Sequence, residues 1–177
     1  MEKKLITIIA CSLFFTCGCV SKIHVAPELQ TIDPPEKIKN EYVGAKATII
    51  NKEKFGEIKH MTGSYSVPVE GNMYEWTEQA IALITKEIRQ RGGDVAESSG
   101  KDIYVSFEGD ELIYNQWNYS STCKGTLNVE TGSGYKKQYP VANTTGGKVE
   151  RACGGAITLG VIEFLNDKNI MVFMKSN

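Results

Sequence analysis

The sequence has no excess of charge of either sign, since 20 basic residues stand against 21 acidic ones in 177. A chain so balanced offers no basic surface for nucleic acid and no electrostatic attachment to anionic lipid. Histidine is scarce, with His24 near the N-terminus and His60 in a charged segment that we expect to be a loop. Neither has a partner at a diagnostic spacing, and no G-x-S-x-G or H-E-x-x-H motif is present. We therefore expect no catalytic residues, no metal ligands and no cofactor.

Apolar runs long enough to span a membrane are also lacking. The longest lies at the N-terminus, where Leu5–Phe15 follows Lys3 and Lys4. A basic head, a short apolar stretch and small residues after it are typical of a secretory signal peptide. The sequence therefore predicts that residues 1–18 form a signal peptide and are removed.

A cysteine stands directly after this segment, Cys19 behind Gly18. The arrangement resembles the lipobox of bacterial lipoproteins, with Thr16 where that family prefers Leu. The resemblance implies that Cys19 carries diacylglycerol and becomes the mature N-terminus. The alternatives are Cys17 as the acceptor, or ordinary secretion without a lipid. In a Gram-negative source, Val20 in place of an Asp implies the outer membrane, facing the periplasm; a Gram-positive source would place the domain at the cell surface.

The five cysteines indicate the same compartment. Cys11 and Cys17 leave with the signal peptide, and Cys19 takes the lipid. Cys123 and Cys153 then remain in an oxidising space, where two thiols are expected to pair. Closing that loop is worth about 3.5–4 kcal/mol in the chain-entropy model. A cysteine nucleophile or a metal site is the competing interpretation, but structural zinc needs four nitrogen or sulfur ligands.

Residues 19–42 are predicted to form a lipid-anchored, flexible tether. Pro27 and Asp33-Pro34-Pro35 interrupt this segment, and the charged run 36–41 has too few apolar groups to build a core. As a loose coil it would average roughly 25–30 Å from end to end. A single domain, residues 43–177, follows.

Two main helices are predicted in this domain. Asn72–Arg91 is the clearer one, because its apolar residues recur at three- and four-residue steps and form one stripe. The second follows a loop at 143–147 and places Cys153 on its inner side. Its small residues would let it approach the sheet closely: Gly154, Gly155, Ala156 and Gly160. A last short helical turn is expected at Ile170–Met174.

The predicted strands lie at Val43–Ile50, at Tyr65–Val69 and from Ile103 onward, with a turn at Gly109-Asp110 and a hairpin loop at 131–134. Apolar residues of odd number are expected to share one inward face: Ile113, Trp117, Tyr119, Cys123, Leu127 and Val129. This parity brings Cys123 to the interface between sheet and helix, where Cys153 lies. The order of elements indicates an α+β two-layer sandwich, an antiparallel sheet packed by two main helices.

Two further segments invite a functional interpretation. Tyr114–Tyr119 interleaves aromatic residues with amides, a composition common in glycan- and protein-recognition surfaces. The interpretation that we favour is that Trp117 and Tyr119 belong to the core. The segment 143–148 precedes a helix, but it lacks the first glycine and the final Ser or Thr of a phosphate-binding loop. We expect it to be only the connection into that helix.

The lipobox at Cys19, the order of strands and helices, and the tail 166–174 together resemble small uncharacterised bacterial envelope lipoproteins. The resemblance implies a non-enzymatic accessory protein, held at the membrane by its lipid. We expect it to act by binding an envelope protein partner or a cell-wall component. One alternative is an inhibitor or immunity-type lipoprotein directed against an envelope-targeting enzyme. A second alternative is a hydrolase of envelope polymer.

Overall fold

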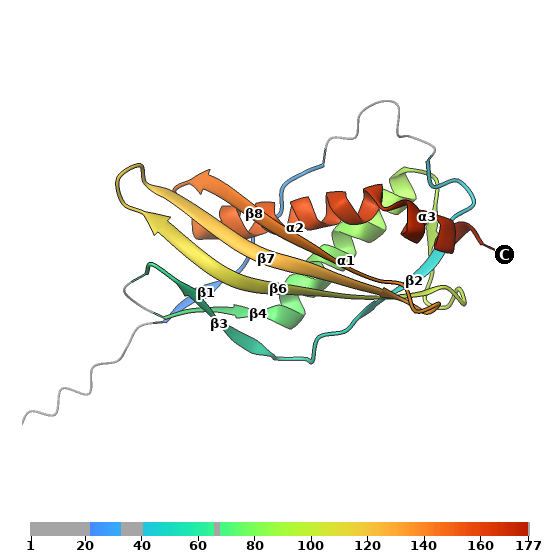
Figure 1. The fold of residues 1–177 in the computed structure, drawn as a ribbon, viewed down its shortest axis with the longest axis horizontal. Coiled ribbons are helices and arrows are strands. Elements are labelled where there is room, and N and C mark those ends of the chain that lie inside the picture. Colours follow the sequence, from blue (N-terminus) through green and yellow to red (C-terminus); the bar gives the residue numbers. More distant parts are fainter. Residues whose placement is uncertain (1–21, 33–40, 66–67, 177) are drawn as a thin grey trace, which may run out of the picture.

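The computed structural model describes residues 22–32, 41–65 and 68–176. Within these ranges strands and helices form a mixed α/β fold with three helices (Figure 1). The strands are β1 (Ile23–Val25), β2 (Lys46–Asn51), β3 (Ile58–Gly63), β4 (Val69–Asn72), β5 (Asp94–Val95), β6 (Asp102–Asn115), β7 (Ser120–Thr131) and β8 (Lys136–Gly146). The helices are α1 (Met73–Gln90), α2 (Val149–Asn166) and α3 (Lys168–Lys175). The predicted signal peptide and Cys19 lie outside the described residues.

The strands form one curled sheet, and it is mixed rather than antiparallel as the sequence predicted. β6, β7 and β8 are antiparallel neighbours joined by short turns. β2 and β3, however, both pair with β6 in parallel, and β1 pairs with β4 in parallel. Parallel neighbours need a long crossover: α1 lies in the connections from β2 and β3 to β6, and the connection from β1 to β4 contains β2 and β3. Alternating hydrophobicity shows which face a strand buries but not which strand lies beside it, so the prediction of an antiparallel sheet was wrong.

β6 passes through Gly109-Asp110 without the predicted turn. Its register against β7 shifts between Gly109 and Glu111, which marks a β-bulge. The buried parity changes there, from Phe107 before the bulge to Leu112 after it. A Cβ atom on Gly109 would lie 2.7 Å from the ring of Trp76, so this glycine gives the indole room against the sheet.

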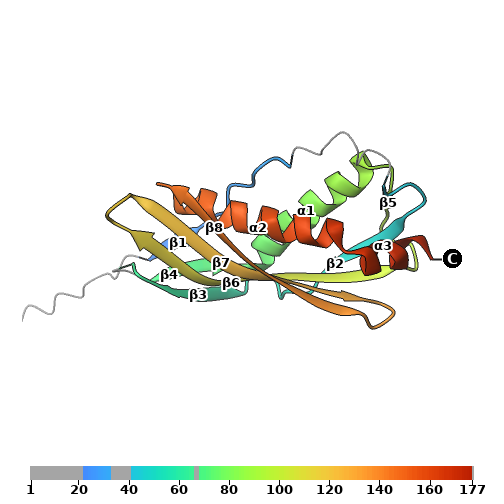
Figure 2. The ribbon, with the colours of Figure 1, turned by 45° about the horizontal axis from the view of Figure 1, so that its top comes forward.

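The helices predicted from the sequence are confirmed. Asn72 caps α1, because its Oδ1 atom accepts a hydrogen bond of 3.2 Å from the amide of Glu75. α1 and α2 lie on one face of the sheet, and the core fills the space between (Figure 2). The expected C-terminal turn is α3, which buries Ile170 and Met174.

The expected disulfide between Cys123 and Cys153 is present. Cys123 lies on β7 and Cys153 on α2, and both are buried at the interface between the sheet and that helix. Their Cα atoms are 5.0 Å apart, a normal separation for a disulfide. The bond joins the two layers directly.

The tether prediction does not hold for residues 22–32. Ile23–Val25 forms β1 against β4, and Val25 is fully buried. The segment after it follows α2, where the amide of Glu28 donates 2.9 Å to the carbonyl of Glu150 and the amide of Gln30 donates 3.3 Å to the hydroxyl of Thr158. The domain therefore begins before residue 43.

The small residues of α2 serve this N-terminal segment as well as the sheet. A Cβ atom on Gly154 would collide with the carbonyl of Glu28, and one on Gly155 would collide with the side chain of Asn143 on β8. Gly160 faces β7, where a Cβ would lie 3.0 Å from Leu127. α2 thus approaches the sheet closely, as expected from the sequence. It also approaches the segment that contains Glu28, which was predicted to belong to the tether.

Candidate functional site

The face of β6, β7 and β8 turned away from α1 and α2 is polar, and no described helix covers it (Figure 2). Positions of even number on β7, and on β6 before its bulge, point to it, as expected from the period of two. A shallow open hollow of about 760 Å³ lies on this face. It is lined by Lys52, Glu53, Tyr104, Ser106, Glu108, Asn128, Val129, Glu130, Lys136, Lys137 and Gln138.

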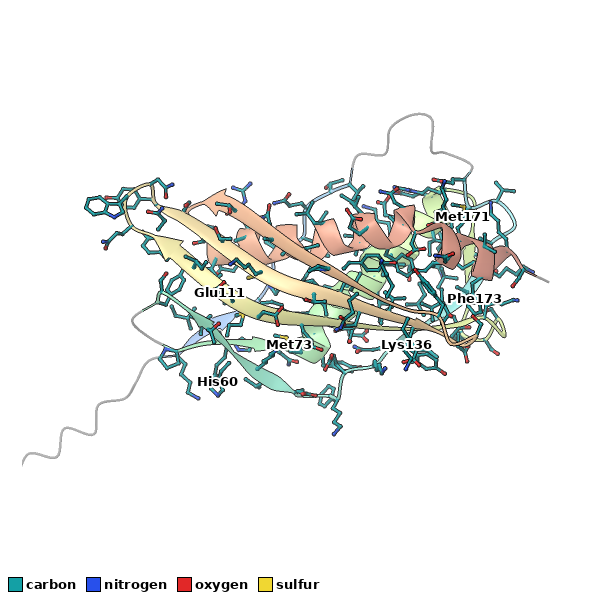
Figure 3. The ribbon with its side chains drawn as sticks, in the orientation of Figure 1. His60, Met73, Glu111, Lys136, Met171 and Phe173 are labelled. Carbon is teal, nitrogen blue, oxygen red and sulfur yellow. A yellow bond between two sulfur atoms is a disulfide. The ribbon has the colours of Figure 1, made fainter. Side chains whose placement is uncertain are left out.

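Charged side chains at one side of the hollow are paired across strands. Glu130 on β7 pairs with Lys52 at 2.7 Å and with Lys136 of β8 at 3.0 Å. Lys136 is labelled in Figure 3. Hydrogen bonds from these two ammonium groups lower the pKa of the Glu130 carboxyl. Glu130 therefore stays ionised, and the trio presents a net positive edge to the hollow.

The other side of the hollow is a chain of hydrogen bonds. Gln138 donates to Asn128 at 2.9 Å, and Asn128 donates to Glu108 at 3.1 Å. Lys59 of β3 reaches the same Glu108 carboxylate at 3.2 Å. Side chains held in this way lose little further freedom when a partner binds, which favours recognition by a preformed surface.

One carboxyl in the hollow is perturbed in the opposite direction. Partial burial raises the pKa of Glu53, and repulsion from Glu57 and Glu108 raises it further. A carboxyl of this kind takes up a proton more readily than an ordinary glutamate. The hollow thus presents polar groups of either sign.

The aromatic segment predicted at Tyr114–Tyr119 forms the end of the β6–β7 hairpin. The core assignment of the odd positions was wrong for Trp117 and Tyr119, which are 88% and 70% exposed. It was also wrong for Ile113, which pairs with Thr122 and is only half-buried, while its neighbour Leu112 pairs with the buried Cys123. β6 ends at Asn115 and β7 begins at Ser120, so a four-residue turn interrupts the alternation that the prediction carried across it. Cys123, Leu127 and Val129, beyond the turn, are buried as predicted.

His60 lies on β3 rather than in a loop, with Nδ1 3.1 Å from an Oε1 atom of Glu70. Of the segment 143–148, residues through Gly146 belong to β8, and Lys148 stands at the N-terminus of α2 without a side-chain cap. Within the described ranges, no three His, Cys, Asp or Glu residues are grouped as metal ligands would be.

Asp167 is the most highly connected carboxylate outside the hollow. Burial opposes its ionisation, but hydroxyl hydrogen bonds from Tyr139 at 2.6 Å and Tyr135 at 2.8 Å, with the amides of Asn169 and Ile170, lower its pKa. The same carboxylate caps α3. Through these contacts Asp167 connects the N-terminus of α3 to the sheet.

Residues 22–32, 41–65 and 68–176 include no helix both long and apolar enough to cross a membrane. Neither a protein-family model nor a curated protein matches the chain. Among solved structures, the chain is similar to a Xanthomonas campestris protein of the DUF330 family, with 10% sequence identity and a TM-score of 0.47. The superposition covers 81% of this chain and 89% of that one.

Proposed function

We propose that the protein is a lipid-anchored accessory lipoprotein of the bacterial envelope, without enzymatic activity, which binds a protein partner or a cell-wall component. In a Gram-negative source it would stand on the outer membrane and face the periplasm. The observation that carries the proposal is the uncovered polar hollow over β6, β7 and β8. The lipobox at Cys19 supplies the membrane attachment.

The hollow suits a binding role because its polar groups are already oriented. Ion pairs join Glu130 to Lys52 and Lys136. Hydrogen bonds join Asn128 to Glu108 and Gln138. A partner with complementary charges would therefore meet a surface that needs little rearrangement. Confinement to the membrane by the lipid would raise the effective concentration of the protein near a partner there.

Replacing the proposed acceptor tests the anchor. Cys19→Ala is expected to abolish incorporation of a labelled fatty acid and to move the protein from the membrane fraction to the soluble fraction. Cys17→Ala is the matched control and should keep both properties. Label that survives in Cys19→Ala and disappears in Cys17→Ala would assign the anchor to Cys17. Label absent from the unaltered protein would indicate ordinary secretion.

A photo-crosslinking amino acid tests the binding face. Placed at Gln138 in the hollow, it is expected to capture a defined envelope component in cells, and at Val172, exposed on α3, it should not. Equal capture at both positions, or none at Gln138, would contradict the proposed surface. A partner kept by the Cys19→Ala protein would favour the inhibitor or immunity-type alternative, because an inhibitor of a soluble enzyme does not need the membrane.

The perturbed Glu53 favours one second candidate, the hydrolase of envelope polymer. A carboxyl of raised pKa near a second carboxyl, Glu108, is an arrangement used in general acid–base catalysis. The purified protein would then release soluble fragments from envelope polymer, and Glu53→Gln would abolish the release. If the unaltered protein releases no fragments, the hydrolase alternative is contradicted and the binding function remains.

A further inference from the structure

The turn of the β6–β7 hairpin presents two aromatic side chains to solvent. Trp117 and Tyr119 are both largely exposed, although rings of this size usually bury most of their surface. The turn is ordered: the amide of Trp117 donates 3.0 Å to Asn115, and the carbonyl of Tyr119 accepts 2.7 Å from the amide of Gly147. Tyr119 has a φ of 52°, a left-handed conformation that disfavours a residue with a Cβ atom. An aromatic residue is thus held outward at an unfavourable backbone position.

The turn and the strand ends that lead into it carry no charge of their own, and Lys148 follows Gly147 beside the turn. Residues 112–123 include no Asp, Glu, Lys or Arg. The charged residues that flank them, Glu111 and Lys124, pair with each other at 2.7 Å between β6 and β7. Glu111 is labelled in Figure 3. Amides and hydroxyls alternate with the aromatic rings between these two positions. The hairpin end can therefore leave bulk water without stripping an ion of its hydration.

The hairpin turn and the start of the described chain lie at the same end of the molecule. Ile23 in β1 stands beside Val69 of β4, which pairs with Met61 of β3, and β3 then pairs with β6 through Gly63 and Leu112. The β3–β4 connection also touches the hairpin, since Ser64 exchanges hydrogen bonds of 3.0 and 2.7 Å with the backbone of Tyr114. Both views show β1 and the hairpin turn at this end (Figures 1 and 2).

The lengths of two chain segments allow Cys19 and the hairpin turn to lie at the same depth in the membrane surface. Three residue steps separate Cys19 from Lys22, and they span at most about 10 Å. A lipid on Cys19 would hold this end of the domain close to the bilayer. β6 continues from Leu112 to Asn115 beyond its pairing with β3, which is also about 10 Å. The hairpin turn can therefore reach the headgroup region in which the lipidated cysteine would lie.

We propose that the turn Gln116–Tyr119 inserts Trp117 and Tyr119 into the headgroup interface of the membrane that holds the lipid on Cys19. Tryptophan and tyrosine favour this interface because the ring is apolar while its N–H or O–H remains hydrated. Two contacts, lipid and hairpin, fix the orientation of the domain. Residues 104–108 of the hollow lie in the half of β6 farther from the turn, so the hollow would stay clear of the bilayer. This inference rests on the anchor proposed above.

Tryptophan fluorescence can test the insertion directly, because the chain has two tryptophans and one of them, Trp76, is fully buried. The full lipidated protein is reconstituted into vesicles of phosphatidylethanolamine and phosphatidylglycerol, with and without acyl chains brominated near the headgroup. Insertion predicts a blue shift of Trp117 emission on reconstitution and a loss of that emission in the brominated vesicles. Trp117→Phe should show neither effect, since Trp76 lies inside the domain.

The matched control carries an exposed tryptophan elsewhere. Phe55 is 89% exposed and precedes the first residue of β3, away from the hairpin, so Phe55→Trp combined with Trp117→Phe should remain unquenched. A lipidated protein that floats with the vesicles while Trp117 stays unquenched would overturn the insertion and leave the anchor intact. A Trp117 signal that responds only to a protein partner would have the same meaning. A protein that carries no lipid and does not float would overturn the anchor and the insertion together.

Discussion

Trp76→Ala is expected to lower the free energy of unfolding by about 3–5 kcal/mol. The indole is fully buried on α1, 6.1 Å from the ring of Phe107, in a space left open by Gly71 and Gly109. Glycine at those two positions offers no side chain to fill the space if the indole is removed. The substitution therefore creates a cavity between α1 and β6, near the point at which β6 bulges.

Part of this effect comes from one hydrogen bond. Nε1 of Trp76 donates 3.0 Å to the buried carbonyl of Val25, and this bond ties β1 to α1. Trp76→Phe keeps most of the apolar volume and removes the donor, so it should cost less than Trp76→Ala, about 1–3 kcal/mol, because it leaves that carbonyl unpaired. Urea denaturation followed by circular dichroism measures both.

Trp117→Ala is the matched control for Trp76, since its indole is exposed. We expect its stability to change by no more than about 0.5 kcal/mol. Equal denaturation midpoints for Trp76→Ala and the unaltered protein would show that the α1–β6 contact is not a main source of stability. A large loss in Trp117→Ala would instead assign the hairpin turn a structural role.

Reduction of the Cys123–Cys153 disulfide is expected to lower the free energy of unfolding by about 3–4 kcal/mol, because the bond closes a loop with a sequence separation of 30 residues in the unfolded chain. The two thiols released would remain buried between β7 and α2, so the packing would change little. The effect is measured as the shift of the urea midpoint between oxidised and reduced protein.

The control for reduction is the double variant Cys123→Ala with Cys153→Ala, whose midpoint should not respond to reductant. Its stability should lie near that of the reduced protein or slightly below it, because each alanine also removes a buried sulfur. An oxidised protein with a linked peptide pair but an unchanged midpoint after reduction would contradict the expectation. It would mean that the unfolded chain is already constrained in this region.

Some local elements were predictable because their signals lie within a few neighbouring residues. The stripe of α1 repeats at the helical period, and Asn72 and Gly92 mark its two ends, so its bounds were predicted almost to the residue. The disulfide was predicted from two inferences, an expected oxidising compartment and the parity of Cys123 on β7. Tyr119 shows where that parity fails, because a four-residue turn resets the alternation without any break in composition.

The polar hollow could not be predicted, because its residues are far apart in the chain. Lys52, Glu108 and Glu130 come from three separate segments, and each alone is an ordinary surface charge on a strand or loop. The antiparallel pairing of β6 with β7 brings Glu108 and Glu130 to one face, and the parallel pairing of β2 with β6 adds Lys52. The composition of the aromatic hairpin indicated a candidate recognition surface, but it did not predict that Trp117 and Tyr119 are exposed.

What the sequence by itself determined is local: the amphipathic α1, the hairpin loop after β7 and the pairing of Cys123 with Cys153. Tertiary structure decided the parallel placement of β2 and β3 beside β6, the docking of residues 22–32 along α2, and the outward position of Trp117. The physical reason is that periodicity specifies the face that an element buries, whereas its neighbours depend on contacts between distant segments. The carbonyl of Glu28 against Gly154 is such a contact, and neither residue alone indicates the other.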